Sequence, residues 1–336
     1  MLGCSKNDTV PSVSPNINQI YFAGGINTAY LFKENEIVVI ADNYLFYTNN
    51  LFQKLDRYPV GHINETLTPT ITEQYIIFQN IYYSLSVQML NRQGSVSTID
   101  IEKSNSWYSS NPSASNPGIL RDGAFLNEEI GWILNNKDDG KLVLEKYADN
   151  KSQEIFQFQF NDGRIRFYDN LFGYIFLPYR YFSSYYVSPG NVYMATTSDG
   201  GLSWTEPRLI GVDINIWDIQ MLSKNTLIIK QKYDGNDFLF TKDGGLTWSK
   251  VIIPSGYTLE QIISCDLAII KKDGYFSIYD AKSSIILSNI TSPIVNLIWT
   301  AKVCFISADT GIIYTESEMY ITYDKGQNWK KLIKFD

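Results

Sequence analysis

The sequence predicts an all-β fold, a β-propeller whose blades are four-stranded antiparallel sheets. Two observations carry this prediction: a turn motif recurs at intervals of about 44 residues, and about four short strand-like runs lie in each interval. The composition agrees with it, because the chain has 24 Tyr, 18 Phe and 7 Trp among 336 residues. Aromatic side chains suit the half-buried surfaces of a sheet.

The turn motif reads Thr-x-Asp-x-Gly-x-(Ser/Thr/Asn)-Trp, and it is complete in residues 197–204, 241–248 and 322–329. The aspartates of the first two copies are 44 residues apart, and those of the last two are 81 apart. Since 81 is close to twice 44, a degenerate copy is expected between them. The residues expected to form these turns are Asp199, Gly201, Trp204, Asp243, Gly245, Trp248, Asp324, Gly326, Trp329 and, in the degenerate copy, Asp280.

Weaker copies extend the series toward the N-terminus. Positions 50, 92 and 149 keep parts of the motif, so the whole series indicates seven repeated units. We therefore predict seven blades, with six or eight as the alternatives, in one domain that spans residues 17–336. Residues 104–118 are rich in Ser, Asn and Pro, and we expect a long loop there.

The motif suits a tight hairpin between two strands. The Asp side chain accepts hydrogen bonds from the backbone amides of the turn. The Gly two residues later takes a positive φ that a side chain would oppose. The Trp begins the next strand, and its ring is expected between neighbouring sheets. These predicted roles are structural, and no catalytic residue is assigned.

Composition and charge exclude several classes of function. The net charge of -7 repels phosphate backbones, so nucleic acid is not an expected partner. No apolar run approaches the roughly 18 residues of a membrane span. The single histidine, His62, leaves little material for a His-based metal site or a catalytic triad. The acidic turns at 138–140 and 234–237 lack the ligand spacing of a calcium loop. Neither a metal nor a cofactor is expected.

The three cysteines lack CxxC spacing, which argues against a disulfide framework or a zinc site. Cys265 and Cys304 lie in apolar runs and are expected to be free buried thiols. Cys4 differs, because Leu2-Gly3-Cys4 followed by a polar stretch resembles the end of a bacterial lipoprotein signal. That resemblance implies a lipid anchor on Cys4, residues 1–16 as a tether, and a place on the bacterial cell envelope or outside the cell. No charged or apolar leader precedes Cys4 in this sequence.

The turn motif resembles the Asp-box, or bacterial neuraminidase (BNR), repeat. The phrase from Phe125 to Trp132 and the Gly-Gly-Leu-Thr-Trp that ends at Trp248 resemble photosystem II stability/assembly factor-like propellers. That family is seven-bladed, and the resemblance implies an assembly or docking role. Sialidases and sortilin-type domains share the same turn, so the motif reports the fold and not the function.

A glycoside hydrolase acting from the central funnel is the alternative to a binding role. A sialidase clamps the carboxylate of its substrate with three arginines, and the sialidase resemblance implies Arg57, Arg180 and Arg208 as candidates. Arg57 stands in an Arg-x-Pro phrase, but this phrase follows the first turn motif instead of preceding it. Another glycosidase would need two carboxylates about 5–10 Å apart, and no pair stands out in the sequence.

We predict a non-catalytic binding or assembly propeller in preference to an enzyme. The densely aromatic segment 167–182, with Tyr185 and Tyr186, forms either the core of the fourth blade or a stacking surface. The expected partner is a protein or a glycan bound on the propeller face. Contact with a membrane is expected only through the lipid anchor, and the protein is expected to be a monomer.

Overall fold

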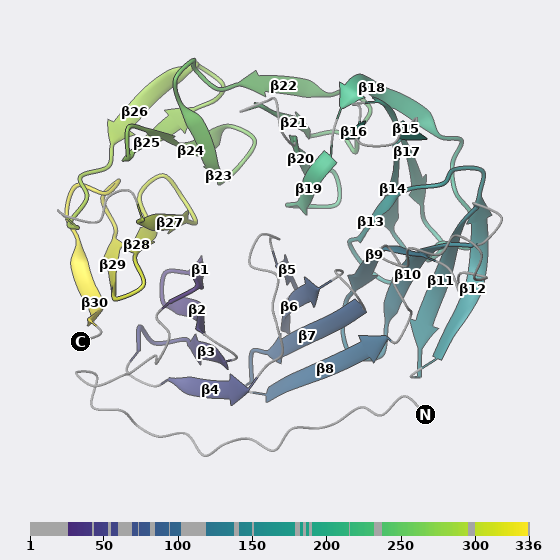
Figure 1. The fold of residues 1–336 in the computed structure, drawn as a ribbon, viewed down its shortest axis with the longest axis horizontal. Helices are drawn as coiled ribbons and strands as arrows, with labels where there is room; N and C mark the ends of the chain where they lie inside the picture. Colours follow the sequence, from purple (N-terminus) through teal and green to yellow (C-terminus); the bar gives the residue numbers. More distant parts are fainter. Residues whose placement is uncertain are drawn as a thin grey trace. The chain divides into compact units, whose positions relative to one another are not determined.

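The computed structural model describes residues 26–41, 44–52, 55–59, 69–72, 74–80, 85–93, 95–101, 119–137, 141–149, 151–178, 182–183, 186–187, 190–214, 216–231, 237–294 and 300–334. The regular structure of these residues is entirely β (Figure 1). It comprises seven four-stranded antiparallel sheets, which are the blades of a seven-bladed β-propeller, as predicted. Within the described ranges, no helix is long and apolar enough to cross a membrane.

Contacts along the chain divide the protein into two compact units. Unit 1 holds the described residues within 66–234 and 239–249, and unit 2 holds those within 26–65, 235–238 and 250–336. Blades 2, 3 and 4 belong to unit 1, and blades 1, 6 and 7 belong to unit 2. Blade 5 draws its strands from both units.

The blades of unit 1 follow one another along the chain. Blade 2 contains β5 (Thr70–Ile71), β6 (Tyr75–Asn80), β7 (Leu85–Asn91) and β8 (Ser95–Ile101). Blade 3 contains β9 (Ile119–Phe125), β10 (Gly131–Asn136), β11 (Leu142–Ala148) and β12 (Lys151–Phe158). Blade 4 contains β13 (Arg164–Phe167), β14 (Gly173–Pro178), β17 (Gly190–Thr197) and β18 (Arg208–Ile214), with the small pair β15 (Phe182–Ser183) and β16 (Tyr186–Val187) between β14 and β17.

The other blades have the same order of strands. Blade 5 contains β19 (Ile216–Met221), β20 (Leu227–Gln231), β21 (Asp237–Thr241) and β22 (Ser249–Ile252). Blade 6 contains β23 (Thr258–Ile262), β24 (Leu267–Lys272), β25 (Tyr275–Asp280) and β26 (Ile285–Asn289). Blade 7 contains β27 (Lys302–Phe305), β28 (Gly311–Tyr314), β29 (Glu318–Thr322) and β30 (Lys330–Lys334), and blade 1 contains β1 (Thr28–Lys33), β2 (Glu36–Ala41), β3 (Tyr44–Thr48) and β4 (Asp56–Pro59). Apart from blade 4, whose β14 and β17 are separated by the pair β15 and β16, every blade is built from consecutive strands, the first and the last blade included.

The predicted turn positions mark one place in every blade. Positions 50, 92, 149, 199, 243 and 324 lie between the third and fourth strands, and Asp280 ends the third strand of blade 6. The periodicity in the sequence therefore follows the third hairpin of each repeat. The predicted loop at 104–118 lies outside the described residues.

The core lies between neighbouring sheets of each unit. In unit 1, Trp132 of β10 stacks parallel on Phe167 of β13, and Trp204 meets Phe167 edge to face. In unit 2, one apolar cluster joins blade 1 to blade 7 and includes Ile37 and Val39 of β2 with the following residues of blade 7: Ile312, Tyr314, Met319 and Ile321. The first and last blades are thus packed against each other.

The first hairpin of three blades has a second recurrent feature. A Phe at the end of the first strand covers a Gly at the start of the second, in the pairs Phe125–Gly131, Phe167–Gly173 and Phe305–Gly311. A Cβ on any of these glycines would overlap the ring. The phrase from Phe125 to Trp132 is the blade 3 example of this hairpin. In its turn, Asn127 Oδ1 accepts hydrogen bonds from the amides of Glu129 and Ile130.

Candidate functional site

The three complete turn motifs share one hydrogen-bond pattern, shown here for blade 5. The buried Thr241 Oγ1 accepts the amide of Gly245 at 2.8 Å and donates to Asp243 Oδ1 at 2.7 Å. Asp243 then accepts the amide and the hydroxyl of Thr247. The same bonds join Thr197, Asp199, Gly201 and Ser203. In the third copy, Thr322, Asp324, Gly326 and Asn328 make the corresponding bonds, and the side-chain amide of Asn328 donates in place of a hydroxyl.

These hydrogen bonds act on the acidity of the aspartates. Those from Ser203 lower the pKa of Asp199 to about 2, and those from Thr247 lower the pKa of Asp243 to about 2. The amide of Asn328 lowers the pKa of Asp324, and the hydroxyl of Ser283 lowers that of Asp280. The carboxylates are therefore committed to holding their own turns.

The degenerate copies keep only part of this geometry. Asp280 accepts the amides of Lys282 and Ser283. In blade 1, Thr48 Oγ1 accepts the amide of Phe52 and donates to Asn50, so the turn keeps its hydrogen bonds with Asn in place of Asp. Leu51 and Phe52 take positive φ there, which complete copies leave mainly to glycine.

The motif tryptophans pack against aromatic rings. Trp204 meets Phe158 of blade 3, Trp248 meets Phe176 of blade 4, and Trp329 meets Phe305 of its own blade. The indole nitrogens of Trp204 and Trp329 also donate to the carbonyls of Gly201 and Gly326.

The three arginines of the hydrolase alternative lie in different settings. Arg57 lies on β4, the fourth strand of blade 1, with its guanidinium carbon 3.6 Å from the centre of the Tyr44 ring. Arg208 begins β18, the fourth strand of blade 4, and donates to the carbonyl of Gly244 at 3.0 Å. Arg180 and Cys4 lie outside the described residues. Arg57 and Arg208 thus each have a local structural contact. The clamp of three arginines on a substrate carboxylate stays a prediction.

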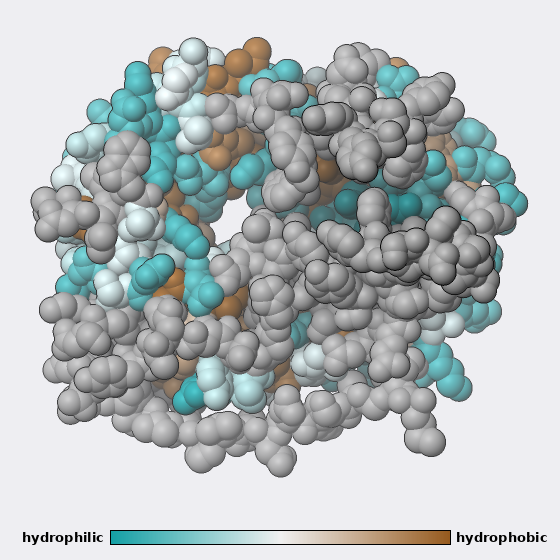
Figure 2. Space-filling view, in the orientation of Figure 1, coloured by the Kyte–Doolittle hydropathy of each residue, from teal (hydrophilic) through white to brown (hydrophobic). Residues whose placement is uncertain are grey.

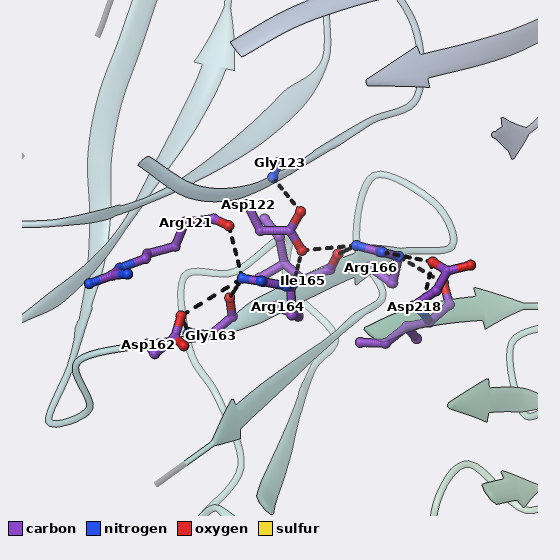
Figure 3. Close-up of polar contacts among 10 residues, drawn as sticks. Arg121, Asp122, Gly123, Asp162, Gly163, Arg164, Ile165, Arg166 and Asp218 are labelled. Atoms are coloured by element: carbon purple, nitrogen blue, oxygen red, sulfur yellow. Dashed lines mark hydrogen bonds and ion pairs between the residues drawn. The ribbon is translucent and has the colours of Figure 1, made fainter. Parts of the chain in front are cut away.

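A buried charge network joins the first strands of blades 3, 4 and 5 (Figure 3). Asp122 of β9 accepts the amide of Ile165 of β13 at 2.9 Å and an Nη1 hydrogen of Arg166 at 2.9 Å. The Arg166 Nε donates to the carbonyl of Ile219 of β19 at 3.0 Å, and its Nη2 lies 3.7 Å from Asp218. Asp122 and Asp218 are 2% and 4% exposed, so one guanidinium compensates two buried carboxylates.

A second arginine links the first strands of blades 3 and 4. Arg164 donates to the carbonyl of Arg121 at 2.9 Å and lies 3.7 Å from Asp162. Asp162 and Asp122 each also accept the amide of the glycine that follows them. We call Asp122, Asp162, Arg164, Arg166 and Asp218 the charged bridge.

Neutral side chains make the corresponding links in unit 2. The side-chain amide of Gln261 on β23 makes two hydrogen bonds with the backbone of Phe305. Its Nε2 donates to the Phe305 carbonyl at 2.8 Å, and its Oε1 accepts the Phe305 N–H at 2.7 Å. The Cys304 thiol on β27 donates to the carbonyl of Leu31 at 3.9 Å and accepts its N–H at 3.4 Å. We call Gln261 and Cys304 the neutral bridges. Neither cysteine of the described part forms a disulfide; Cys265 is buried and Cys304 half-buried.

These bridges limit the chemistry that the first strands can perform. A glycosidase needs one carboxyl group that can donate a proton and a second that can attack or activate water. Asp122 and Asp218 instead share Arg166 and accept backbone amides. Within the described ranges, no three His, Cys, Asp or Glu side chains gather as a metal site requires.

Apolar side chains gather on one end of blades 4 and 5. The first and third hairpin turns of each blade lie together, because Gly200 N donates to Leu171 O and Gly244 N donates to Asn225 O. These turns expose Tyr168 (49%), Leu171 (54%), Leu202 (62%), Leu222 (48%) and Leu246 (72%). We call these five residues the blade 4–5 turn surface.

The turns of the two blades are fixed side by side. The Tyr174 hydroxyl of blade 4 donates to the carbonyl of Lys224 of blade 5 at 2.6 Å, and burial raises the pKa of Tyr174 to about 12. Arg208 of blade 4 holds the carbonyl of Gly244 of blade 5. The five apolar residues therefore stand on one rigid support.

Sequence reasoning found the turns and missed both the charged bridge and the turn surface. Asp122-Gly123 and Asp162-Gly163 are the signals that could have marked the bridge, since both Asp-Gly pairs belong to first strands or their entry. Leu202 and Leu246 occupy the variable position after the Gly of the motif. Of the aromatic segment, Phe167, Tyr174 and Phe176 are buried in the core, whereas Tyr168 is exposed.

Comparisons with known proteins add little to this picture. No family model matches the chain, and no curated protein matches it. Among solved structures, Hsv2 from Kluyvelomyces marxianus is similar with 10% identity and a TM-score of 0.49, covering 89% of this chain and 92% of that one. YCF48 from Cyanidioschyzon merolae has 11% identity, a TM-score of 0.41 and coverage of 94% and 88%. A eukaryotic initiation factor has 9% identity, a TM-score of 0.46 and coverage of 96% and 92%. These likenesses agree with the propeller fold and do not assign a function.

Proposed function

We propose that this protein is a non-catalytic propeller that binds a partner protein through the blade 4–5 turn surface. The observation that carries the proposal is the gathering of five exposed apolar side chains on one end of two adjacent blades. Apolar side chains scattered singly over a surface need no explanation, but a contiguous group is typical of a binding surface.

The described turns of blades 6 and 7 are more polar, although Tyr323 of blade 7 is 46% exposed. On the same hairpins of blades 6 and 7, the exposed residues include Lys282, Ser283, Asp309, Lys325 and Gln327. Charged, hydroxyl and amide groups thus take the place of leucine at these turn tips, while the backbone pattern is kept. A difference that the fold does not require supports a role in recognition.

The charges around the surface specify the partner further. Lys224 and Lys242 are exposed in the blade 5 turns, whereas the carboxylates of Asp199 and Asp243 are directed to their own backbone amides. A partner segment that presents apolar side chains flanked by acidic residues would complement this arrangement.

The charged bridge supports a non-catalytic role. Its buried acids are paired with Arg164 or Arg166 and with backbone donors. This arrangement differs from the two carboxyl groups that flank the scissile bond in a glycosidase. No observation on the described residues favours the hydrolase alternative.

The test is site-specific photo-crosslinking in cells that make the protein. A photoreactive residue at position 246 should give one discrete adduct, and a second change, Leu202→Asp or Leu222→Asp, should abolish it. Tyr275→Asp is the matched control, since Tyr275 is 62% exposed and belongs to blade 6. An adduct that persists in Leu202→Asp would overturn the proposal. An adduct with the mass of two copies would also overturn it and would indicate self-association.

We also propose that the protein is held at the bacterial cell envelope through a lipid on Cys4. The support is the Leu-Gly-Cys phrase of the sequence. Metabolic labelling with an alkyne fatty acid should mark the wild-type chain in the membrane fraction, and Cys4→Ser should be unlabelled and released. Labelling that survives Cys4→Ser would contradict this localisation.

A further inference from the structure

A small polar cavity lies in unit 2 where blade 7 meets blade 1. Its volume is about 210 Å³. Thr300 and Lys302, before and at the start of β27, form one wall, and Thr315 and Glu316, after β28, form the next. Asn27, which leads into β1, completes the polar lining. Figure 2 shows hydrophilic side chains, in teal, grouped where β27 and β1 lie.

The cavity is held open by contacts between the two blades. The amide of Ile26 donates to the carbonyl of Glu316 at 3.0 Å, and the Lys302 ammonium donates to the carbonyl of Asn27 at 2.6 Å. The hydroxyls of Tyr314 and Thr28 lie 3.3 Å apart. These bonds fix both the segment before β1 and the ends of β27 and β28, so the walls are pre-formed before any ligand enters.

The lining has one group of each charge. Lys302 contributes an ammonium with three N–H donors, of which the bond to Asn27 uses one. Glu316, which is exposed, contributes a carboxylate with acceptors only. Thr300 and Thr315 add hydroxyl groups that can donate or accept. Lys302 and Glu316 are both exposed. A ligand with a single charge could pair with only one of them, whereas a zwitterion could pair with both.

We infer that this cavity binds a small zwitterion of the α-amino acid type, with its carboxylate at Lys302 and its ammonium at Glu316. The volume agrees, because pockets for larger ligands span roughly 300–1,000 Å³. The site uses blades 1 and 7 and no residue of the blade 4–5 turn surface, so it is independent of the proposed partner protein.

The test is a titration of the full chain with L-alanine, followed by ligand-detected NMR or calorimetry. N-acetyl-L-alanine lacks the ammonium and L-alanine amide lacks the carboxylate. Each analogue should bind about tenfold more weakly than L-alanine, which corresponds to the loss of one charge-assisted hydrogen bond.

Two variants should change the preference among these three ligands in opposite directions, and misfolding would not produce such a result. Lys302→Met should remove the preference for L-alanine over its amide and keep the preference over the acetyl compound. Glu316→Gln should do the reverse. Lys325→Met is the control, because Lys325 is an exposed lysine of the same blade outside the cavity. Absence of L-alanine binding to the wild type would overturn the inference. Binding of D-glucose that survives both variants would also overturn it and would make the cavity a site for neutral polyols.

Discussion

The first strands of neighbouring blades are linked by charged side chains in blades 3 to 5 and by neutral side chains in blades 6, 7 and 1. In every blade the first strand is an edge of its sheet, and an edge strand carries backbone groups without ladder partners. In unit 1 the charged bridge forms hydrogen bonds with the backbone N–H of Ile165 and the backbone carbonyl of Ile219. In unit 2 the neutral bridges reach both backbone groups of Phe305 and of Leu31.

The difference teaches where the structure depends on single residues. A buried ion pair contributes little net stability compared with an apolar pair, but loss of one partner leaves an uncompensated charge. A neutral amide or thiol leaves only unpaired dipoles when it is removed. The charged bridge should therefore be the more sensitive of the two to substitution, although both have the same geometric role.

The largest effect is expected for Arg166→Met. This change leaves Asp122 and Asp218 buried without their cation, so the free energy of unfolding should fall by about 3–5 kcal/mol. Urea denaturation followed by tryptophan fluorescence measures it. The control is Arg57→Met, which removes only a surface stacking contact on Tyr44 and should cost about 0.5–1 kcal/mol. Equal losses for the two variants would show that the charged bridge has no special weight.

A smaller effect is expected for Gln261→Leu. Two hydrogen bonds to Phe305 disappear, and the expected loss is about 2–3 kcal/mol. Because no ionised group takes part, the loss should be the same at pH 5 and pH 8. The neighbouring exposed residue supplies the control, Glu260→Leu, with an expected change within about 0.5 kcal/mol. A loss that varies with pH would contradict the neutral character of this bridge.

Cys304→Ala should cost less again, about 1 kcal/mol, because a thiol is a weak donor and acceptor. Burial raises the pKa of Cys304 to about 11, so the thiol stays protonated near neutral pH. Iodoacetamide at pH 7.5 should modify Cys304 far more slowly in the native protein than in urea, as measured by mass spectrometry. Fast native alkylation would show that blades 7 and 1 separate readily.

The smallest expected effect on stability comes from the turn aspartates, whose contribution depends on pH. Their pKa values are lowered in the folded state, to about 2 for Asp199 and Asp243. Their contribution is therefore complete above the unfolded value near 4 and is lost as the pH falls toward 2. The urea midpoint of the wild type should drop across this window. The drop should be smaller in the double variant Asp199→Asn, Asp243→Asn, and an unchanged drop would assign the acid sensitivity to other groups.

The sequence predicted the blades because their third turns carry local chemistry. Thr241, Asp243 and Gly245 bond with one another and with Thr247, so the hydrogen bonds of this turn stay within seven residues. The charged bridge could not be predicted in this way, because Asp122, Arg166 and Asp218 come from three blades and meet only after folding. The exposure of Leu202 and Leu246 was equally hidden, since a variable position of the motif gives no sign of the side it faces.

The packing of blade 1 on blade 7 has a consequence for the order of events during synthesis. Ile37 and Val39 complete their apolar cluster only with Ile312, Met319 and Ile321, and roughly 240 residues separate the end of β4 from the start of β27. At about 5–20 residues per second, the ribosome needs roughly 12–50 s to supply the missing partner. During that interval the first blade presents one uncovered apolar face to its surroundings. Of the seven blades, the one that leaves the ribosome first is thus among the last to be finished, and a chaperone that covers exposed apolar surface would act on it.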